Sequence, residues 1–340
     1  MADRAGLIAR FLDQAGWGDA VQAPLPGDAS FRRYVRLRDG DRRTAILMDA
    51  PPPQENVRPY LAVARLLRRL GFGAPAIYGQ DAENGLLLLE DLGDDTYMRL
   101  LAQGEPEEPL YSLAVDVLIA LRRRFTAKEM KESKFLPPYD EQRLLDEAAL
   151  LVDWYWPAIT GAPVDPALRA EYRAAWRSVL PPVRRPPPTL VLRDYHVDNL
   201  MRVPNRNGLL ECGLLDFQDA VIGPPSYDLV SLLEDARRDI AGDLAARMRQ
   251  RYLAAFPELD RTAFDISYAI LGAQRSAKIV GIFTRLCVRD GKPQYLAHIP
   301  RVWRLLQQDL AHPALAPLAA WFSRHIPETE RRIPPCRPAA

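Results

Sequence analysis

The sequence predicts an α+β fold with two lobes, a small antiparallel-sheet lobe over residues 1–92 and a larger, mainly helical lobe over residues 93–340. Two observations favour this division. The first 92 residues hold two pairs of strand-like runs, whereas helical periods dominate most of residues 93–340. The chain has 340 residues, of which 48% are hydrophobic, so it is long and apolar enough to give each lobe a core.

The first lobe is predicted to begin with a helix and a hairpin. Apolar side chains recur at helical spacing within residues 3–16. In the stretch FRRYVRLRDGDRRTAILMD, two strand-like runs flank Asp39-Gly40-Asp41, which is a strong signal for a hairpin turn. The three prolines at 51–53 then end the second strand.

A second helix and two further strands complete the first lobe. Residues 57–70 repeat apolar side chains at helical spacing, and Gly71 stands where a glycine commonly ends a helix. A short strand is predicted near 76–78, followed by the apolar run 86–89. Hairpin, helix and second strand pair therefore predict a small sheet with one helix on it, and a hinge near residue 92 with a cleft behind it.

The second lobe is predicted to be helical with one interruption. Helical periods run from Thr96 to about Leu180 and again over about 227–322. Between them, the segment PPVRRPPP breaks the helical pattern and leads into LVLRD and CGLLDFQDA. Each of these two runs has the pattern of a short buried strand that ends in an acid, Asp194 in the first and Asp216 in the second.

Charge and cysteine content exclude several classes of protein. The 45 Lys and Arg residues nearly balance the 44 Asp and Glu residues, so the chain has no net field to gather nucleic acid or an anionic membrane. Cys212, Cys287 and Cys336 are far apart and lack the spacing of a zinc site or a disulfide framework. With charges inside the N-terminal helical period and no long apolar run, these features predict a cytoplasmic protein.

Three polar side chains near the two later strands predict an active site. Asp194 closes the first strand, Asn199 follows five residues later and Asp216 closes the second strand, so we expect the three at one end of a sheet. Amide and carboxylate oxygens suit Mg²⁺, which takes its remaining ligands from phosphates and water. An aspartate outside the metal sphere suits a base that orients a hydroxyl, and phosphoryl transfer requires both functions.

The stretches LRDYHVDN and LLDF resemble the catalytic and metal motifs of the protein-kinase-like superfamily, in its aminoglycoside phosphotransferase and choline kinase branch. Arg-Asp and the four-residue gap to Asn are kept, while Leu192 replaces a histidine. The resemblance implies a protein-kinase-like two-lobe fold, with ATP as co-substrate and Mg²⁺ as cofactor. It implies Asp194 as the catalytic base and Asn199 and Asp216 as the Mg²⁺ ligands.

The same resemblance assigns a role to each lobe. Residues 1–92 would bind the nucleotide, with the backbone of Glu90 to Leu92 receiving adenine, and residues 93–340 would carry catalysis and acceptor binding. The segment PPSYDLVSLL resembles the part of this branch in which Asp228 caps a helix and braces the catalytic loop.

Five stretches narrow the resemblance further. DASFRRY, MDAPPP, RDYHVDNLM, LLDFQDA and YDLVSLLEDARRD are together similar to the bacterial anomeric kinases of cell-wall sugar recycling, over about residues 5–325. This similarity implies a sugar kinase that uses ATP to phosphorylate the C1 hydroxyl of N-acetylmuramate and N-acetylglucosamine in peptidoglycan recycling. The implied partners are ATP and a small amino sugar, and neither nucleic acid, membrane nor another protein.

Two positions depart from the kinase pattern. LPGDASF holds one glycine, Gly27, where a glycine-rich loop is expected, so the phosphates would be met by nearby backbone N–H groups and the Ser30 hydroxyl. Met48 stands where a phosphate-binding lysine is expected, and methionine cannot neutralise phosphate. We expect Arg33 to supply the missing cation, with Arg32 as the alternative.

Contacts to the acceptor are predicted close to the motif. His196 and Asp219 are expected to contact the sugar, and a cation such as Arg237 could hold the lactyl carboxylate of N-acetylmuramate. A role in bracing the loop is an equal alternative for His196. Glu234 and Arg238 are four residues apart on a predicted helix, and with Arg237 they could instead form a solvated helix face.

The sequence leaves two other functions possible for the protein. It also leaves two roles possible for one group of aromatic residues. An aminoglycoside kinase would need an acidic pocket for its polycationic acceptor, whereas arginines flank this motif. A nucleotide-binding regulator without activity would account for Met48 and the missing glycine loop, but the intact Asp194, Asn199 and Asp216 argue against it. The aromatic residues 154–156 could stack on a sugar or pack in the core.

Overall fold

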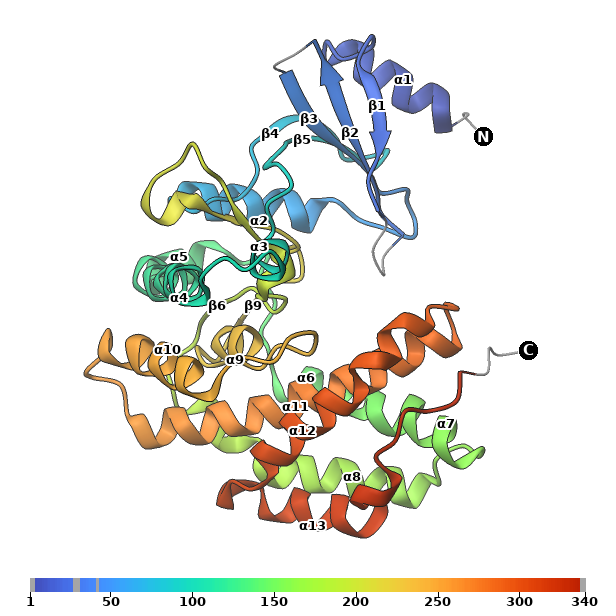
Figure 1. Ribbon diagram of the computed structural model, residues 1–340, viewed down its shortest axis with the longest axis vertical. Helices are drawn as coiled ribbons and strands as arrows, with labels where there is room; N and C mark the ends of the chain where they lie inside the picture. The colour runs from blue at the N-terminus through green and yellow to red at the C-terminus, as the bar shows by residue number, and fades with distance from the viewer. Residues whose placement is uncertain (1–3, 27–30, 41–42, 337–340) are drawn as a thin grey trace. The chain divides into compact units, whose positions relative to one another are not determined.

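The computed structural model describes residues 4–26, 31–40 and 43–336, and the chain falls into two compact units (Figure 1). Unit 1 comprises Met1–Val117 with Val197–Ala220, and unit 2 comprises Leu118–His196 with Val221–Ala340. Each unit thus joins two separate stretches of chain, and the boundary predicted at residues 92 and 93 stays a prediction. In the described part of the chain, no helix carries an apolar stretch long enough to cross a membrane.

Unit 1 contains the predicted antiparallel sheet, with strand order β1-β2-β3-β5-β4. The helix α1 (Arg4–Gln14) lies along this sheet (Figure 1) and buries Phe11 and Leu12 against Leu37, Leu47 and Leu88. This packing follows from the two periodicities, since the apolar stripe of the helix meets the apolar face of the strands. The strands are β1 (Val21–Pro24), β2 (Arg33–Asp39), β3 (Arg43–Asp49), β4 (Ile77–Asp81) and β5 (Leu86–Glu90).

The β2–β3 hairpin sets which side chains share a face of the sheet. Tyr34 lies opposite Met48, and Arg36 lies opposite Ile46, so these four side chains point to the same side. The predicted second helix is α2 (Arg58–Arg69), and Gly71 follows it with φ +80°, which confirms the predicted glycine stop.

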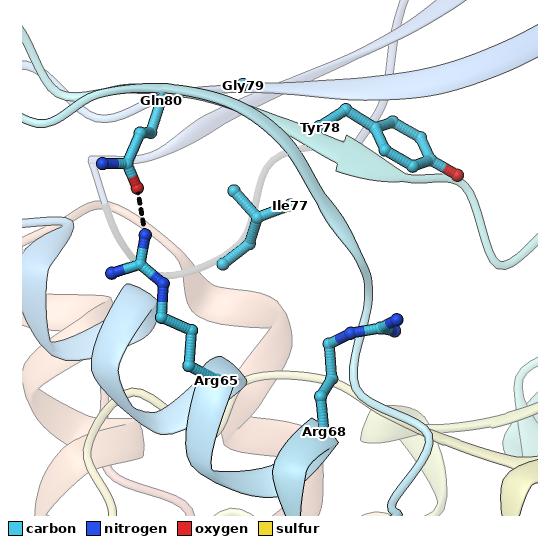
Figure 2. Close-up of a pocket in the computed structure, with 6 residues that line it drawn as sticks. All are labelled: Arg65, Arg68, Ile77, Tyr78, Gly79 and Gln80. Atoms are coloured by element: carbon cyan, nitrogen blue, oxygen red, sulfur yellow. Dashed lines mark hydrogen bonds between the residues drawn. The ribbon is translucent and has the colours of Figure 1, made fainter.

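A shallow surface pocket lies where α2 passes β4 (Figure 2). It is lined by the long side chains of Arg65 and Arg68 and by Tyr78, which is 55% exposed. Arg65 donates a hydrogen bond to the Gln80 side chain across it. No predicted site residue within the described part of the chain lines this pocket.

The remainder of unit 1 is built from two helices and a second, two-stranded sheet. The strand β7 (Leu200–Arg202) pairs antiparallel with β8 (Cys212–Leu214). The Leu214 N–H donates to the carbonyl of Gly73 at 3.1 Å, which ties this hairpin to the segment after α2. The helices of this region are α3 (Tyr97–Ala102) and α4 (Glu107–Arg124), the latter crossing the division between the units.

Unit 2 is helical, as predicted, and its core surrounds the long helix α11 (Arg261–Val288), which packs against α6 and α12. Tyr155 is fully buried in this core and Trp156 packs on it, so these two residues of the aromatic run at 154–156 have the packing role. The other helices are α5 (Ala127–Glu132), α6 (Glu141–Leu150), α7 (Trp156–Thr160), α8 (Pro166–Val179), α9 (Tyr227–Leu233), α10 (Gly242–Ala254), α12 (Ile299–Leu310) and α13 (Ala316–His325).

The strands that precede Asp194 and Asp216 lie in different sheets. The expectation that Asp194, Asn199 and Asp216 meet at one end of a sheet is therefore wrong. The strand β6 (Thr189–Val191) pairs with β9 (Val221–Gly223) in unit 2. The strand β8 instead pairs with β7 in unit 1. The physical reason is that β7 and β8 are joined by a turn and close into a hairpin with each other, which leaves β6 to pair with β9.

The spacing of the cysteines predicted no disulfide, but the structure contains one. Cys287, at the end of α11, and Cys336, in the C-terminal segment, form a disulfide with Cα atoms 5.9 Å apart. Their separation of 49 residues gave no pairing signal in the sequence. Cys212 is buried in β8 and takes no part in this bond.

Candidate functional site

Unit 1 holds a pocket of about 370 Å³ beside the predicted hinge, which we call the hinge pocket. Four elements line it: the β2–β3 hairpin, the α2 helix, the segment after β5, and the residues around β7 and β8. Five of the predicted site residues lie on its walls, namely Met48, Glu90, Leu92, Asn199 and Asp216. The sheet face that carries Tyr34 and Met48 is thus one wall of the pocket.

The other predicted nucleotide contacts are Ser30 and Arg33. Ser30 lies outside the described residues, as does Gly27. Arg33 is exposed at the start of β2, and it is not among the described residues that line the hinge pocket. Alternation along the strand explains this, since Arg33 points to the face opposite Tyr34.

The hinge segment after β5 is fixed by a buried arginine. The ladder with β3 ends at Glu90, so the next residues leave the sheet. Arg36 is 8% exposed and pairs with Asp91 and Asp94, each at 2.8 Å, while its guanidinium also donates to the Gly93 carbonyl at 3.0 Å. Both partner carboxylates raise the pKa of Arg36 against the opposing effect of burial. Arg36 therefore stays charged and holds the hinge backbone in one place.

Arg32, directly before β2, places a cation next to the predicted metal ligand Asp216. Its Nη1 lies 3.5 Å from Asp216 Oδ1, and its Nε donates to Glu55 Oε2 at 3.1 Å. Burial lowers the pKa of Arg32, but neighbouring groups, Glu55 and Asp216 among them, outweigh burial and raise it. Arg32 is therefore a charged group held by one carboxylate and directed at a second.

Asp216 itself has a constrained backbone. Its φ is +55°, a left-handed conformation that is uncommon for residues other than glycine and is often found at functional sites. Gln218 donates to its Oδ1 at 2.7 Å, and the Phe217 ring stacks on Tyr60 with centroids 4.9 Å apart. Side-chain packing on both sides of the residue thus holds the aspartate against the pocket.

Asn199 and Asp216 fit a magnesium ion that takes most of its ligands from a nucleotide and water. Both line the hinge pocket, and the Leu215 N–H donates to the Asn199 carbonyl at 2.9 Å, which links the two positions. Among the described residues, no group of three or more His, Cys, Asp or Glu side chains could hold a metal. One amide and one carboxylate oxygen are the small protein contribution that Mg²⁺ commonly has beside phosphates.

The loop that carries Asp194 belongs to unit 2 and is braced by Asp228 from α9. Asp228 accepts hydrogen bonds from the N–H groups of Leu192 at 2.6 Å and Arg193 at 2.8 Å. Arg193 has φ +72°, so the loop turns through a left-handed residue just before Asp194. The brace is as predicted, but the cap is not, because α9 begins at Tyr227 and Asp228 is inside it.

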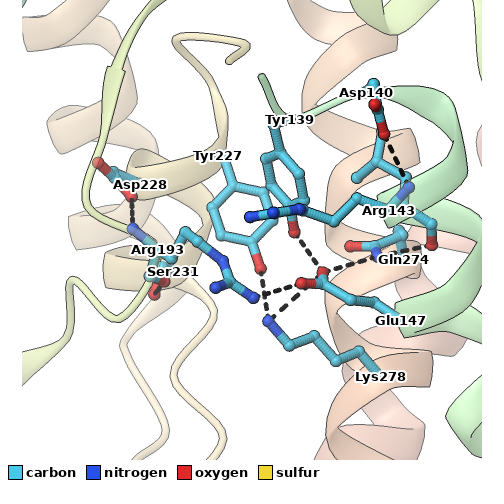
Figure 3. Close-up of polar contacts among 11 residues, drawn as sticks. Tyr139, Asp140, Arg143, Glu147, Arg193, Tyr227, Asp228, Ser231, Gln274 and Lys278 are labelled. Carbon is cyan, nitrogen blue, oxygen red and sulfur yellow. Dashed lines mark hydrogen bonds and ion pairs between the residues drawn. The ribbon is translucent and has the colours of Figure 1, made fainter. Parts of the chain in front are cut away.

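A buried charge cluster fixes the side chain of Arg193 (Figure 3). The Glu147 carboxylate on α6 pairs with Arg193 and with Lys278 of α11, the latter at 3.4 Å, and it also accepts hydrogen bonds from Tyr139 and Gln274. Burial by itself would raise the pKa of Glu147, but the two cations hold it below its ordinary value. Glu147 is therefore ionised and joins three segments of unit 2.

A second pocket, which we call the Asp194 pocket, lies in unit 2 and has a volume of about 100 Å³. Of the predicted residues it brings together Asp194, His196 and Arg237. Asp219 does not line it and is exposed in unit 1. Five residues of α11 that were not predicted as site residues also line it, namely Arg275, Lys278, Ile279, Ile282 and Phe283.

His196 is neutral in this pocket. Burial, together with the charges of Arg237 and Arg275, lowers the pKa of its imidazole to about 3. A neutral imidazole can donate one hydrogen bond and accept another, which suits hydroxyl and amide groups.

Arg275 and Lys278 could have been noticed from the sequence. They interrupt the apolar run AILGAQRSAKIVGIF, and long charged side chains inside such a run require partners or a ligand. This part of the helix has no Asp or Glu beside them, so any ion-pair partner had to come from another element or from a ligand. Which of these applies depends on the tertiary structure.

Glu234 and Arg238 line a different pocket of unit 2, of about 420 Å³. The predicted shared helix is wrong, because α9 ends at Leu233 and Glu234 is its C-terminal cap. Burial raises the pKa of Glu234 to about 7. The pocket contains carboxylates and arginines in similar numbers, and no residue of the Asp194 loop lines it.

Comparison with known proteins assigns the family. The sequence model of the phosphotransferase enzyme family, named APH, matches residues 21–264. An N-acetylmuramate/N-acetylglucosamine kinase from Caulobacter vibrioides is 39% identical, over 97% of this chain and 99% of that protein. Kinases of the same name from Pseudomonas aeruginosa and Neisseria meningitidis are 39% and 35% identical, each over 89% of this chain and over 89% and 90% of the relative.

Solved structures confirm the predicted fold. The GDP complex of wild-type aminoglycoside 2'-phosphotransferase-IIIa matches with a TM-score of 0.61 and 18% identity, over 91% of this chain and 99% of that chain. A choline/ethanolamine kinase family protein from Mesorhizobium loti matches with a TM-score of 0.59 and 14% identity, over 94% and 99%. The α+β, protein-kinase-like architecture predicted from the motifs is therefore correct.

Proposed function

Since the chain belongs to the phosphotransferase enzyme family, we propose that it is an ATP- and Mg²⁺-dependent kinase for the C1 hydroxyl of N-acetylmuramate and N-acetylglucosamine. Relatives of this name match the chain over nearly their whole length. The observation that carries the proposal is the Asp194 pocket, where one carboxylate shares a small cavity with Arg237, Arg275 and Lys278. Such a pocket suits a compact acceptor that is neutral or anionic.

The hinge pocket is the proposed nucleotide site. Adenine would lie between Met48 and the backbone after Glu90, which Arg36 holds in place. Asn199 and Asp216 would hold Mg²⁺, which when bound neutralises charge on the phosphates. Arg32, fixed by Glu55, would supply the cation that Met48 cannot. This assigns to Arg32 the role first expected of Arg33, because Arg32 is the one that reaches Asp216.

The Asp194 pocket is the proposed acceptor site. The Asp194 carboxylate would orient the C1 hydroxyl and accept its proton as the oxygen attacks the terminal phosphate of ATP. An anomeric hydroxyl is more acidic than other sugar hydroxyls, so a weakly basic carboxylate suffices. Neutral His196 would exchange hydrogen bonds with the sugar, while Asp219 stays a prediction without support from the pocket.

Aminoglycosides are disfavoured as acceptors by the same pocket. These acceptors are polycations, and a cavity lined by three cationic side chains and one aspartate would repel them. The fold alone does not decide this, since the likeness to aminoglycoside phosphotransferases is at 18% identity. The charge of the Asp194 pocket therefore distinguishes between aminoglycosides and amino sugars as acceptors.

The test is a direct assay of the purified protein with Mg²⁺, ATP and a panel of amino sugars and aminoglycosides. NMR should place the new phosphate on C1 of N-acetylmuramate or N-acetylglucosamine, and the Asp194→Asn variant should bind nucleotide without turnover. Phosphate on another hydroxyl, or on an aminoglycoside alone, would contradict the proposed acceptor. Nucleotide binding with no turnover on any acceptor would favour the regulator.

A further inference from the structure

Arg275 is a buried cation whose position is not explained by the fold. It lies in the middle of α11, is 6% exposed and lines the Asp194 pocket. Among the described residues, no carboxylate forms an ion pair with its guanidinium and no hydrogen bond satisfies it. Burying a guanidinium in this state is costly, since charged side chains are rarely buried without partners. An arginine of this kind is expected to have a ligand.

The neighbouring cation Lys278 shows the contrast. One turn further along α11, its ammonium lies 3.4 Å from Glu147 and 3.5 Å from the Tyr227 hydroxyl. The charge of Lys278 is therefore already compensated inside the protein. Arg275 lines the same pocket without such a pair.

Two carboxylates near Arg275 could be regarded as its counter-charges, but neither fulfils that role. Burial raises the pKa of Asp228 and of Glu234, and the charge of Arg275 partly opposes this effect, so Arg275 acts on both carboxylates through space. The Asp228 oxygens are already used by the backbone N–H groups of Leu192 and Arg193. Neither carboxylate comes within ion-pair distance of Arg275 in the described structure.

The two proposed acceptors differ in charge, because one of them carries a carboxylate group that the other lacks. N-acetylmuramate carries a lactyl ether at C3 that ends in a carboxylate, and N-acetylglucosamine has a plain hydroxyl there. The Asp194 pocket has three cationic side chains, of which Lys278 is paired with Glu147. A guanidinium is well suited to a carboxylate, because it can donate two parallel hydrogen bonds to it.

We propose that Arg275 recognises the lactyl carboxylate of N-acetylmuramate and so sets the preference of this kinase between its two sugars. This rests on the proposed function, since it assumes that the Asp194 pocket holds the acceptor. Asp194 orients the C1 hydroxyl, and Arg275 binds the C3 substituent of the same ring. N-acetylglucosamine is then accepted without using Arg275.

The experiment compares one pair of enzymes on three substrates. Wild type and Arg275→Gln are assayed for kcat/KM with N-acetylmuramate, its neutral methyl ester and N-acetylglucosamine. In wild type, the ester should be poorer than N-acetylmuramate by about 10- to 100-fold, the value of a charge-assisted hydrogen bond. In Arg275→Gln, N-acetylmuramate should fall to the level of its ester, while N-acetylglucosamine should change by less than about threefold.

Two further variants separate recognition from folding. Arg285→Gln removes another arginine of the same helix that does not line the pocket, and it should leave all three values unchanged. Arg275→Lys keeps the positive charge and should restore part of the preference for N-acetylmuramate. If Arg275→Gln does not fold, the ester comparison in wild type still tests whether the carboxylate is recognised.

The outcomes that overturn the inference are distinct from failure of the proposed function. An equal fall of kcat/KM on both sugars would show that Arg275 acts on the phosphoryl group or on the fold instead. Unchanged values, or equal use of N-acetylmuramate and its ester by wild type, would also overturn it. Wild type without activity on either sugar would instead contradict the proposed function.

Discussion

The carboxylate of Asp228 accepts the backbone N–H of Arg193 at 2.8 Å and so holds a residue with φ +72° directly before Asp194. The second Asp228 oxygen accepts the N–H of Leu192 at 2.6 Å. A left-handed backbone conformation at an arginine persists only where the surrounding structure holds it in place. This pair therefore determines where the proposed base can point.

Replacing Asp228 with alanine is expected to reduce both stability and turnover. Two buried N–H groups would lose their acceptor, at a cost of about 2 kcal/mol or more in the free energy of unfolding. Asp228→Asn keeps one acceptor oxygen and should recover part of each loss. Urea denaturation and kcat are the measurements, with nucleotide affinity as the control, because the hinge pocket has no residue in this brace. A kcat equal to wild type in Asp228→Ala would contradict the positioning role.

Removing the carboxylate of Glu147 is expected to destabilise the protein strongly. Glu147→Gln leaves the cations of Arg193 and Lys278 without their shared partner, and breaking a buried ion pair costs about 3 kcal/mol. The neighbouring Asp146→Asn is the matched control. Asp146 pairs with Arg173 but its side chain is 57% exposed, so less than about 1 kcal/mol is expected. Equal unfolding midpoints in urea for the two variants would contradict this account.

The pKa of His196 predicts a loss of stability in acid. Its value is about 3 in the folded protein and about 6.5 for an ordinary histidine, so between these limits the unfolded chain binds the extra proton. The free energy of unfolding should fall by about 1.4 kcal/mol for each pH unit below 6.5 from this group. His196→Gln should lack this component. Urea denaturation at pH 5 and pH 7 measures it as a difference of about 2 kcal/mol between the two proteins.

That comparison also removes the contributions of other groups. The raised pKa of Asp228, about 7, acts in the opposite sense, since its stabilising contribution declines as pH rises from about 4 to 7. It is the same in wild type and in His196→Gln. Parallel pH profiles for the two proteins would contradict a neutral, buried His196.

The choice between Arg32 and Arg33 has a direct test. Arg32→Gln should lower kcat/KM for ATP by at least about tenfold, because a charged donor next to the phosphates is lost. Arg33→Gln changes an exposed side chain of the same strand region and should alter it by less than about twofold. If Arg33→Gln has the larger effect, the assignment of the cation to Arg32 is wrong.

The sequence alone determined the local elements and the motif. Alternation and helical period located the β2–β3 hairpin and α2, because those patterns depend on neighbouring residues. The spacing of Asp194, Asn199 and Asp216 pointed to phosphoryl transfer, and the family match agrees with it. It did not show that β6 and β8 belong to different sheets, since pairing depends on which strand returns alongside.

The tertiary structure decided the surroundings of those motifs. Glu147 reaches Arg193 from 46 residues away, and Arg275 and Lys278 reach the Asp194 pocket from α11. Such contacts depend on how helices pack, and the charge of a single residue in an apolar run does not reveal its partner. The sequence therefore predicts the chemistry of this protein, while the packing of unit 2 around α11 decides the charge of the pocket that would receive its substrate.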